Sequence, residues 1–263
     1  MNKNKILQEF FFFNDKLLKI YKNYNNFYSI GKQFGGYSIE YNNMKIKFEK
    51  AVDDNLTTVY LSSLDKNNNC ILILIYKDDK TAIIQGITSE KCFKNPEFNN
   101  GKYLLTITIK FLKKYKDKFN INRIELTDNS FINCNHEGIK IWLADLSLLQ
   151  YGDTFYGRFG FIPNKKIDYN NLNDNKKLLE KLLTKNINLK EFVNINYELN
   201  KNLLKILYLS YDEFKNKLFI EWFNYISKKL MKKNCEFFEY FISNILKKLN
   251  LISLAHKPFI LEL

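Results

Sequence analysis

A strand, helix and strand pattern in the middle of the chain restricts the possible fold more than any other feature. Over residues 102–118, apolar side chains recur at three- and four-residue spacings and lysines occupy the opposite side, which is the pattern of an amphipathic helix. A β-type segment, Thr81 to Thr88, precedes this helix, and another, Arg123 to Thr127, follows it. A crossover helix of this length pairs its two strands in parallel, so a ligand crevice is expected at their carboxyl ends. The residues at that edge are Thr88, Asn100, Gly101 and Asp128.

Further β-type segments precede this unit. They cover residues 37–41, 44–49, 57–62 and 69–77, and turn clusters separate them. The run Cys70 to Ile75 is continuously apolar, which is typical of a strand that is covered on both faces. We therefore expect an α+β fold in which helices flank a mixed sheet.

The chain beyond Pro163 has a helical pattern. Residues 164–175 are rich in Asn and Asp and predict a linker. Helical spacing then predicts four helices, near residues 176–184, 187–208, 212–232 and 234–249. One packing row within them is expected from Leu203, Leu207, Tyr211 and Phe214. Residues 258–263 alternate weakly between apolar and polar side chains and predict an edge strand.

These patterns divide the chain into three regions. A helical pattern over residues 2–24 ends at a break that contains several glycines. We therefore expect an N-terminal helical segment over residues 1–36, a core domain over residues 37–168 and a C-terminal all-helical extension over residues 169–263. A length of 263 residues is enough for one large domain or two small ones.

The charge of the chain is strongly positive, with 41 Lys and Arg against 28 Asp and Glu. A basic face is typical of proteins that bind nucleic acids. However, Arg123 and Arg158 are the only arginines, and the bidentate recognition of bases and phosphates favours Arg over Lys. We therefore interpret the lysines as a solvated basic surface and do not expect specific binding to nucleic acid.

The four cysteines, Cys70, Cys92, Cys134 and Cys235, lack the spacing of a metal site or a redox motif. We expect buried free thiols. The two histidines, His136 and His256, stand apart from any cysteine or carboxylate pattern, so a metal site is not expected. The chain has no apolar run long enough to span a membrane and no secretory signal, which predicts a cytoplasmic protein.

Four motifs follow one another in the order strand, turn, helix start and aromatic turn. They are Ile83 to Thr88, Asn95-Pro96-Glu97-Phe98, Gly101-Lys102-Tyr103-Leu104-Leu105, and Phe155-Tyr156 with Gly160-Phe161. Together they resemble the core of the GNAT superfamily, the acyl-CoA-dependent N-acyltransferases. The resemblance covers residues 57–163 and implies a GNAT-like mixed sheet flanked by helices.

The resemblance also implies that acetyl-CoA binds as a co-substrate. Its diphosphate is expected at consecutive main-chain amides around the helix start, because a helix N-terminus favours an anion. These amides belong to Asn99, Asn100, Gly101, Lys102 and Tyr103. The pantetheine arm is expected along the backbone of Ile87, Thr88 and Ser89.

The chemistry implied by the resemblance is the transfer of an acetyl group to an unidentified amine. Tyr156 occupies the position of the family's general acid, which returns a proton to the departing thiolate. Asp128, Asn129 and Ser130 are expected to line the substrate side. Candidates for a general base are Glu90, Glu97 and Asp128, each of which has a solvated charge or a helix cap as its alternative interpretation.

The chain departs from the family in its phosphate turn. The family reads Gln/Arg-x-x-Gly-x-Gly/Ala, whereas this chain reads Pro96-Glu97-Phe98-Asn99-Asn100-Gly101. Because Asn tolerates left-handed backbone better than most residues, Asn99 is expected to replace the first glycine.

Three functions remain open from the sequence. The first is an acetyl-CoA-dependent N-acetyltransferase. The second is a catalytically inactive GNAT-fold interaction or structural protein whose C-terminal helices bind a protein partner. The third is non-specific binding of nucleic acid by the lysines, which would weaken steeply with salt.

Overall fold

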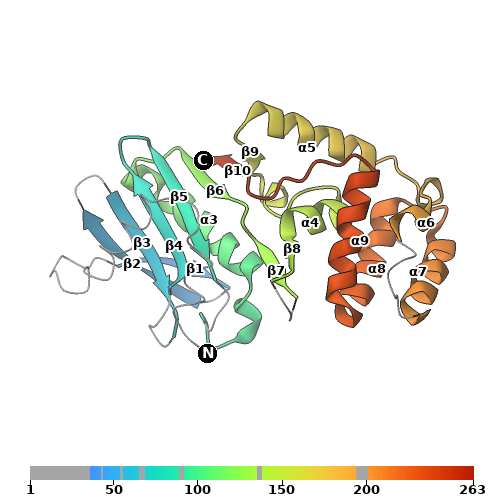
Figure 1. The fold of residues 1–263 in the computed structure, drawn as a ribbon. Coiled ribbons are helices and arrows are strands. Elements are labelled where there is room, and N and C mark those ends of the chain that lie inside the picture. The colour runs from blue at the N-terminus through green and yellow to red at the C-terminus, as the bar shows by residue number, and fades with distance from the viewer. Residues whose placement is uncertain are drawn as a thin grey trace.

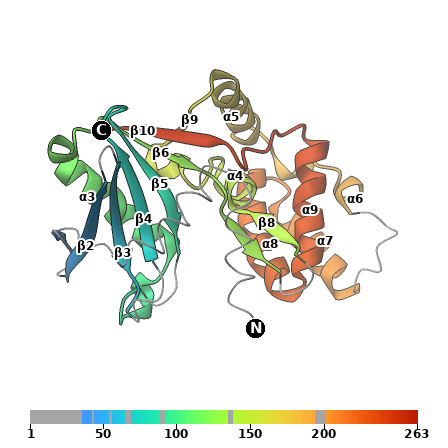
Figure 2. The same cartoon turned by 60° about the vertical axis from the view of Figure 1, so that its left-hand side comes forward.

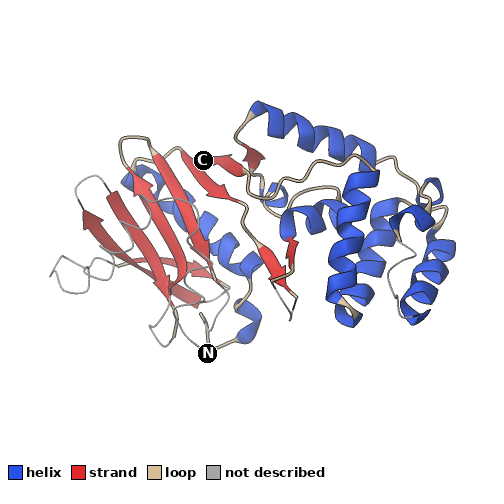
Figure 3. Cartoon of the chain, in the orientation of Figure 1, coloured by secondary structure: helices blue, strands red, loops and turns tan. Residues whose placement is uncertain are grey.

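The computed structural model describes residues 36–42, 44–53, 56–64, 69–88, 92–134, 138–193 and 201–263. The helix expected over residues 2–24 lies outside this part of the chain. Most strands gather on one side of the molecule and the helices of the C-terminal region on the other (Figures 1 and 3). This arrangement confirms the expected α+β class.

An eight-stranded mixed sheet forms the core of the described residues. In spatial order its strands are β1 (Tyr37–Tyr41), β2 (Met44–Asp53), β3 (Leu56–Ser62), β4 (Asn69–Tyr76), β5 (Thr81–Ile87), β6 (Arg123–Thr127), β10 (Pro258–Glu262) and β9 (Ile162–Pro163). All neighbours pair antiparallel except β5 and β6, which pair in parallel. The β-type segments expected from the sequence are therefore strands, with β2 extending to Asp53 instead of Glu49.

Strand β4 is buried on both faces, as its continuous apolar run predicts. Side chains alternate across a strand, so Ile71, Ile73 and Ile75 point to one face and Leu74 to the other. Each of the four is at most 4% exposed.

Helix α3 (Gly101–Phe119) connects β5 to β6 and packs against β1, β4 and β5. Its apolar row is buried, and Phe111 stacks on Phe48 of β2 with ring centroids 4.1 Å apart. The helix ends at Asn120, which is left-handed with φ 53°, a conformation that Asn adopts more readily than most residues. The helix and the parallel crossover predicted from the sequence are both confirmed.

A hairpin and a short helix follow β6. The hairpin consists of β7 (Phe131–Asn133) and β8 (Lys140–Trp142), and α4 (Leu143–Tyr151) continues directly from it. Ala144, Leu148 and Leu149 of α4 are each at most 1% exposed, so this helix lies in the interior between the sheet and the C-terminal helices.

The stretch that was expected to be a linker belongs to a helix, α5 (Lys166–Leu179). Leu172 and Leu179 are buried on its inner face. Asn175 is also buried there, and its side chain donates to the carbonyl oxygen of Ile252 and accepts from the amide of Ile252. The polar composition predicted a linker because Asn and Asp favour turns, but here such side chains bond to neighbouring backbone from within a helix.

The described residues of the C-terminal region form four more α-helices: α6 (Leu189–Phe192), α7 (Lys201–Phe214), α8 (Phe219–Lys233) and α9 (Cys235–Lys248). The expected helix boundaries over residues 187–208 and 212–232 are wrong, because α7 ends at Phe214 and α8 begins only at Phe219. The predicted packing row is confirmed, since Leu203 and Leu207 are buried and Tyr211 and Phe214 pack against the core.

The chain returns to the sheet after α9 (Figure 2). Strand β10 pairs with β6 on one side and with β9 on the other. The expected strand is present, but its predicted edge position is wrong, because β9 occupies that edge. Phe259 on β10 is fully buried, which is consistent with an internal strand.

The expectation of free thiols is also wrong. Cys70 is bonded to Cys92, and Cys134 to Cys235, so all four cysteines are paired. The partners lie 22 and 101 residues apart in the sequence and are brought together by the fold. Disulfides are rare in cytosolic proteins, so the cysteines no longer support a cytoplasmic location.

Candidate functional site

The parallel ladder between β5 and β6 ends before either strand does. Pairing runs from Thr81 and Arg123 to Ile84 and Leu126, whereas β5 continues to Ile87. A register shift between β4 and β5 leaves Gln85 without a partner at the same point. Beyond Ile84 the two strands diverge, β6 toward the β7–β8 hairpin and β5 toward the segment before α3 (Figure 1). Among the residues that the structure describes, the backbone of β5 that faces β6 therefore has no strand partner from Gln85 to Ile87.

The residues expected along a pantetheine arm lie at this divergence. Ile87 pairs with Ile71 of β4, and the amide of Thr88 donates to the carbonyl oxygen of Cys70 at 2.9 Å. Both residues thus bond toward β4 and not toward β6. Ser89 lies outside the described residues, as does Glu90, which was considered as a base.

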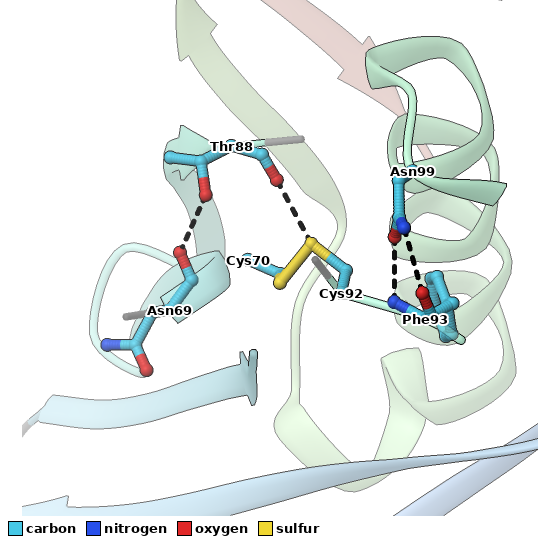
Figure 4. Close-up of a disulfide and its surroundings, with 6 residues drawn as sticks. All are labelled: Asn69, Cys70, Thr88, Cys92, Phe93 and Asn99. Atoms are coloured by element: carbon cyan, nitrogen blue, oxygen red, sulfur yellow. Dashed lines mark hydrogen bonds between the residues drawn. A yellow bond between two sulfur atoms is a disulfide. The ribbon is translucent and has the colours of Figure 1, made fainter. Parts of the chain in front are cut away.

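The turn before α3 is organised by its own asparagines (Figure 4). The side chain of Asn99 accepts from the amide of Phe93 at 2.7 Å and donates to the carbonyl oxygen of Phe93 at 2.8 Å. Asn99 has φ −85° and ψ 58°, so the expectation that it adopts a left-handed conformation is wrong. Its place in the turn is fixed by these two side-chain bonds instead.

Asn100 is the N-cap of α3. Its side-chain oxygen accepts from the amide of Tyr103 at 2.8 Å, which is the usual role of Asn at this position. The amide of Asn99 donates to the carbonyl oxygen of Pro96. Two of the five amides expected to hold the diphosphate are therefore bonded within the turn. Within the described residues, the amides of Asn100, Gly101 and Lys102 have no acceptor, and all three residues are exposed.

Space is open at the Cβ position of Gly101. A Cβ atom built there would have no atom within 4 Å outside its own neighbours and helix backbone. The aromatic rings of the turn pack on one another, with Phe98 stacked on Tyr103 at 4.6 Å and Phe93 against the edge of Tyr103. Phe98 and Tyr103 therefore support the turn without filling the space at Gly101.

A second group of polar residues lies at the carboxyl end of β6. Asp128 is fully buried, and one of its carboxylate oxygens accepts from the amide of Ser130 at 3.2 Å. Burial raises the pKa of Asp128 to about 7, and the nearby charge of Asp145 adds to this, while hydrogen bonds from Ser130 oppose it. The interpretation of Asp128 as a solvated charge is thus wrong.

Tyr156 is hydrogen bonded to this group. Its hydroxyl oxygen lies 2.8 Å from the hydroxyl oxygen of Ser130. Burial raises the pKa of Tyr156 to about 12, the charge of Asp128 contributes in the same direction, and the bond with Ser130 opposes both. Tyr156 is therefore protonated at neutral pH. Its hydroxyl group bonds to the side chain of Ser130, and the backbone amide of the same Ser130 bonds to Asp128.

The glycines of the aromatic turn explain how Tyr156 reaches Ser130. A Cβ atom on Gly157 would overlap the side chains of Asp153 and Thr154, so any other residue there would have to displace them. Gly160 has φ 89°, a left-handed conformation that glycine adopts without steric cost. The turn then places the Tyr156 ring against Phe161 and Phe259.

Three residues of this region were missed by sequence reasoning. A ring nitrogen of His256 lies 2.7 Å from the side-chain oxygen of Asn129, and the His256 ring contacts Trp142 with centroids 4.2 Å apart. Asp145 of α4 is buried, which raises its pKa to about 6 although Ser253 and the amide of Leu254 bond to it. Since 127 residues separate His256 from Asn129, no local pattern could have joined them.

The expected site residues therefore form two groups. One is the open helix start of Asn100, Gly101 and Lys102, and the other is the end of β6 with Asp128, Asn129, Ser130 and Tyr156. Glu97 is exposed in the turn and its backbone amide bonds to Asn95, so it belongs to neither group.

Comparison with known proteins gives no match among family models, curated proteins or solved structures. In the described residues, no three His, Cys, Asp or Glu side chains are grouped as a metal site would require. The described helices include none with the length and apolarity needed to cross a membrane.

Proposed function

We propose that the chain is an acetyl-CoA-dependent N-acetyltransferase that transfers an acetyl group to an amine. The observation that carries the proposal is the parting of the parallel pair β5 and β6 beyond Ile84 and Leu126, beside a helix start with open amides. The order β5, turn, α3, β6, α4 and aromatic turn also agrees with the order of the family core that the sequence resembles.

The start of α3 is suited to an anion such as the diphosphate of CoA. Amides without acceptors and the helix dipole both attract negative charge there. Within the described residues, Asn100, Gly101 and Lys102 supply three such amides, and Lys102 adds a positive side chain. The exposed backbone of β5 from Gln85 to Ile87 would then pair with the amide groups of the pantetheine arm.

The second group of residues would serve the transfer itself. The amine nitrogen attacks the thioester carbon, the carbon–sulfur bond breaks, the nitrogen loses one proton to water, and the departing thiolate takes one proton from the protein. Tyr156 is protonated at neutral pH and is the donor in this proposal. A thiol with a pKa of about 8.5 is a stronger acid than Tyr156, so donation from Tyr156 alone is uphill. Protonated Asp128, which has a pKa of about 7 and bonds to the amide of Ser130 beside Tyr156, is a stronger acid than the thiol, and a proton from Asp128 would make the transfer favourable.

The proposal is tested by calorimetric titration of the protein with acetyl-CoA, followed by an assay with a panel of amines and mass-spectrometric detection of the acetylated product. Tyr156→Phe should bind acetyl-CoA as the wild type does and slow the transfer by about a hundredfold or more, the usual effect of a general acid. Tyr208→Phe, at an exposed tyrosine of α7, is the matched control and should change neither quantity. No binding at millimolar acetyl-CoA would overturn the proposal.

A second function is favoured by the bonds within the turn. The side chain of Asn99 bonds to Phe93, and the side chain of Asn100 occupies the amide of Tyr103, which was expected to bind the diphosphate, so the turn is bonded internally without a ligand. This supports a catalytically inactive protein of the same fold, whose C-terminal helices bind a protein partner. The titration separates the two, since an inactive interaction protein shows no heat with acetyl-CoA.

A further inference from the structure

The segment before α3 is fastened to strand β4 at its beginning (Figure 4). Cys92 forms a disulfide with Cys70, near the start of β4, and both residues are at most 4% exposed. Beside this bond, Thr88 donates its amide to the carbonyl oxygen of Cys70 and its hydroxyl to the carbonyl oxygen of Asn69. The sulfur of Cys92 lies 3.2 Å from the carbonyl oxygen of Thr88.

A series of contacts connects the disulfide to the start of α3. Phe93 follows Cys92 directly, and Asn99 holds both the amide and the carbonyl oxygen of Phe93. Asn100 follows Asn99 and caps α3. The positions of the three open amides are thus set by α3 on one side and by the Cys92 anchor on the other.

We propose that the Cys70–Cys92 disulfide controls the binding of CoA, with the oxidised bond holding the turn in its binding shape and the reduced thiols releasing it. This inference rests on the proposed function, because it concerns the same diphosphate site. The helix start remains after reduction, but the turn that leads into it loses its covalent attachment to β4 and gains conformational freedom. Binding of CoA then has to order the turn, which lowers the affinity.

The reaction that operates the control is a two-electron reduction by a dithiol. A thiolate of the dithiol attacks one sulfur of the bond, the bond between Cys70 and Cys92 breaks, and the second thiol of the reductant closes its own disulfide. Each protein sulfur ends with one proton. Because both cysteines are buried, reduction requires the segment to open, so we expect it to be slow in the absence of bound CoA and slower in its presence.

The second disulfide offers a matched control. It joins Cys134, after β7, to Cys235, at the start of α9, and so involves neither β4 nor the turn. In the variant Cys134→Ala/Cys235→Ala the Cys70–Cys92 bond is the sole disulfide, because the chain has four cysteines. Dithiothreitol then acts on that bond alone.

The test measures the dissociation constant of CoA by calorimetry. Oxidised wild type and oxidised Cys134→Ala/Cys235→Ala should bind CoA equally, and dithiothreitol should weaken binding about tenfold or more in both. Cys70→Ala/Cys92→Ala should show the weak affinity with or without dithiothreitol. Asn99→Ala should weaken binding with both disulfides intact, because it removes the two bonds to Phe93.

Two results would overturn the inference in different ways. If oxidised wild type does not bind CoA, the proposed function fails and the inference fails with it. If wild type binds CoA and folded Cys70→Ala/Cys92→Ala binds it equally well, this inference alone fails. Hydrogen exchange supplies a reading that does not depend on the ligand: the bonded amides of Phe93, Asn99 and Tyr103 should exchange faster in the double variant, and unchanged exchange contradicts the proposed release of the turn.

Discussion

The substitution Gly101→Asp separates the stability of α3 from its capacity to bind an anion. Gly101 is the first residue of the helix, its Cβ position is open, and the first turn contains no acidic residue. A carboxylate at a helix N-terminus stabilises a protein by about 0.3–1 kcal/mol. Removing a glycine also limits the freedom of the unfolded chain. We therefore expect the free energy of unfolding to stay constant or to rise by up to about 1 kcal/mol.

The same carboxylate should strongly disfavour CoA. Two unit charges about 5 Å apart repel by about 0.8 kcal/mol in water and by about 3 kcal/mol at an effective dielectric constant of 20. A diphosphate carries two such charges next to the helix start, so the total is about 2–6 kcal/mol. Since about 1.4 kcal/mol is a tenfold change, the dissociation constant of CoA should rise about thirtyfold or more.

The assay combines calorimetric titration with CoA and urea unfolding followed by circular dichroism. Gly101→Asn is the matched control, because it has the shape of Asp without the charge. Its affinity should exceed that of Gly101→Asp, and the difference should shrink at high salt, where exposed charges are screened. Equal dissociation constants for the Asp and Asn variants would refute an anion site at this helix start.

Three further predictions concern stability. Burial raises the pKa of Asp128 from 3.8 to about 7, so the folded protein retains a proton that the unfolded chain releases, and stability falls as pH rises from about 4 to 7. In urea unfolding, the free energy of unfolding of Asp128→Asn should rise relative to that of wild type by on the order of 4 kcal/mol between pH 4 and pH 8. A difference between the two proteins that does not change with pH contradicts the raised pKa of Asp128. Cys134→Ala/Cys235→Ala removes a disulfide between residues that are 101 apart and should lower the free energy of unfolding by about 5 kcal/mol. Cys70→Ala/Cys92→Ala removes one between residues that are 22 apart and should lower it by about 3 kcal/mol. The reverse order of the urea midpoints would argue against this dependence on loop length. Phe111→Ala should cost about 3–5 kcal/mol by thermal unfolding, because Phe111 is fully buried against Phe48, and a loss below 1 kcal/mol would contradict this packing.

The spacing of apolar residues predicted the helices and strands whose burial follows from their own sequence. The strands up to Ile87, helix α3 and β6 each carry a repeating apolar pattern, and the structure confirms them. Helix α5 carries such a pattern less clearly, because Asp168 and Asn175 occupy its buried face. Their partners are Lys257 and Ile252, which lie far along the chain, so a polar composition concealed a buried helix.

The residues of the candidate site could be named from the sequence, but the contacts between them could not. Gly101, Asp128 and Tyr156 were recognised from their motifs, but the burial of Asp128 depends on Lys257 and His256, whose backbones bond to it. The pairing of cysteines depends on the same long-range contacts. Spacing along the sequence carries no information on either, because both arise from elements that the sheet and the helices bring together.

The position of β10 between β6 and β9 also determines when this part of the sheet can form during synthesis. Until Pro258 to Glu262 have emerged from the ribosome, β6 and β9 have no strand between them, and the carbonyl oxygen of Lys257 is not available to the amide of Asp128. A nascent or shortened chain that lacks these residues would therefore expose one bare edge of β6 to other strands. Translation of this segment is therefore required for the backbone bonds around Asp128, and until then the unpaired edge of β6 is a template for pairing with other chains.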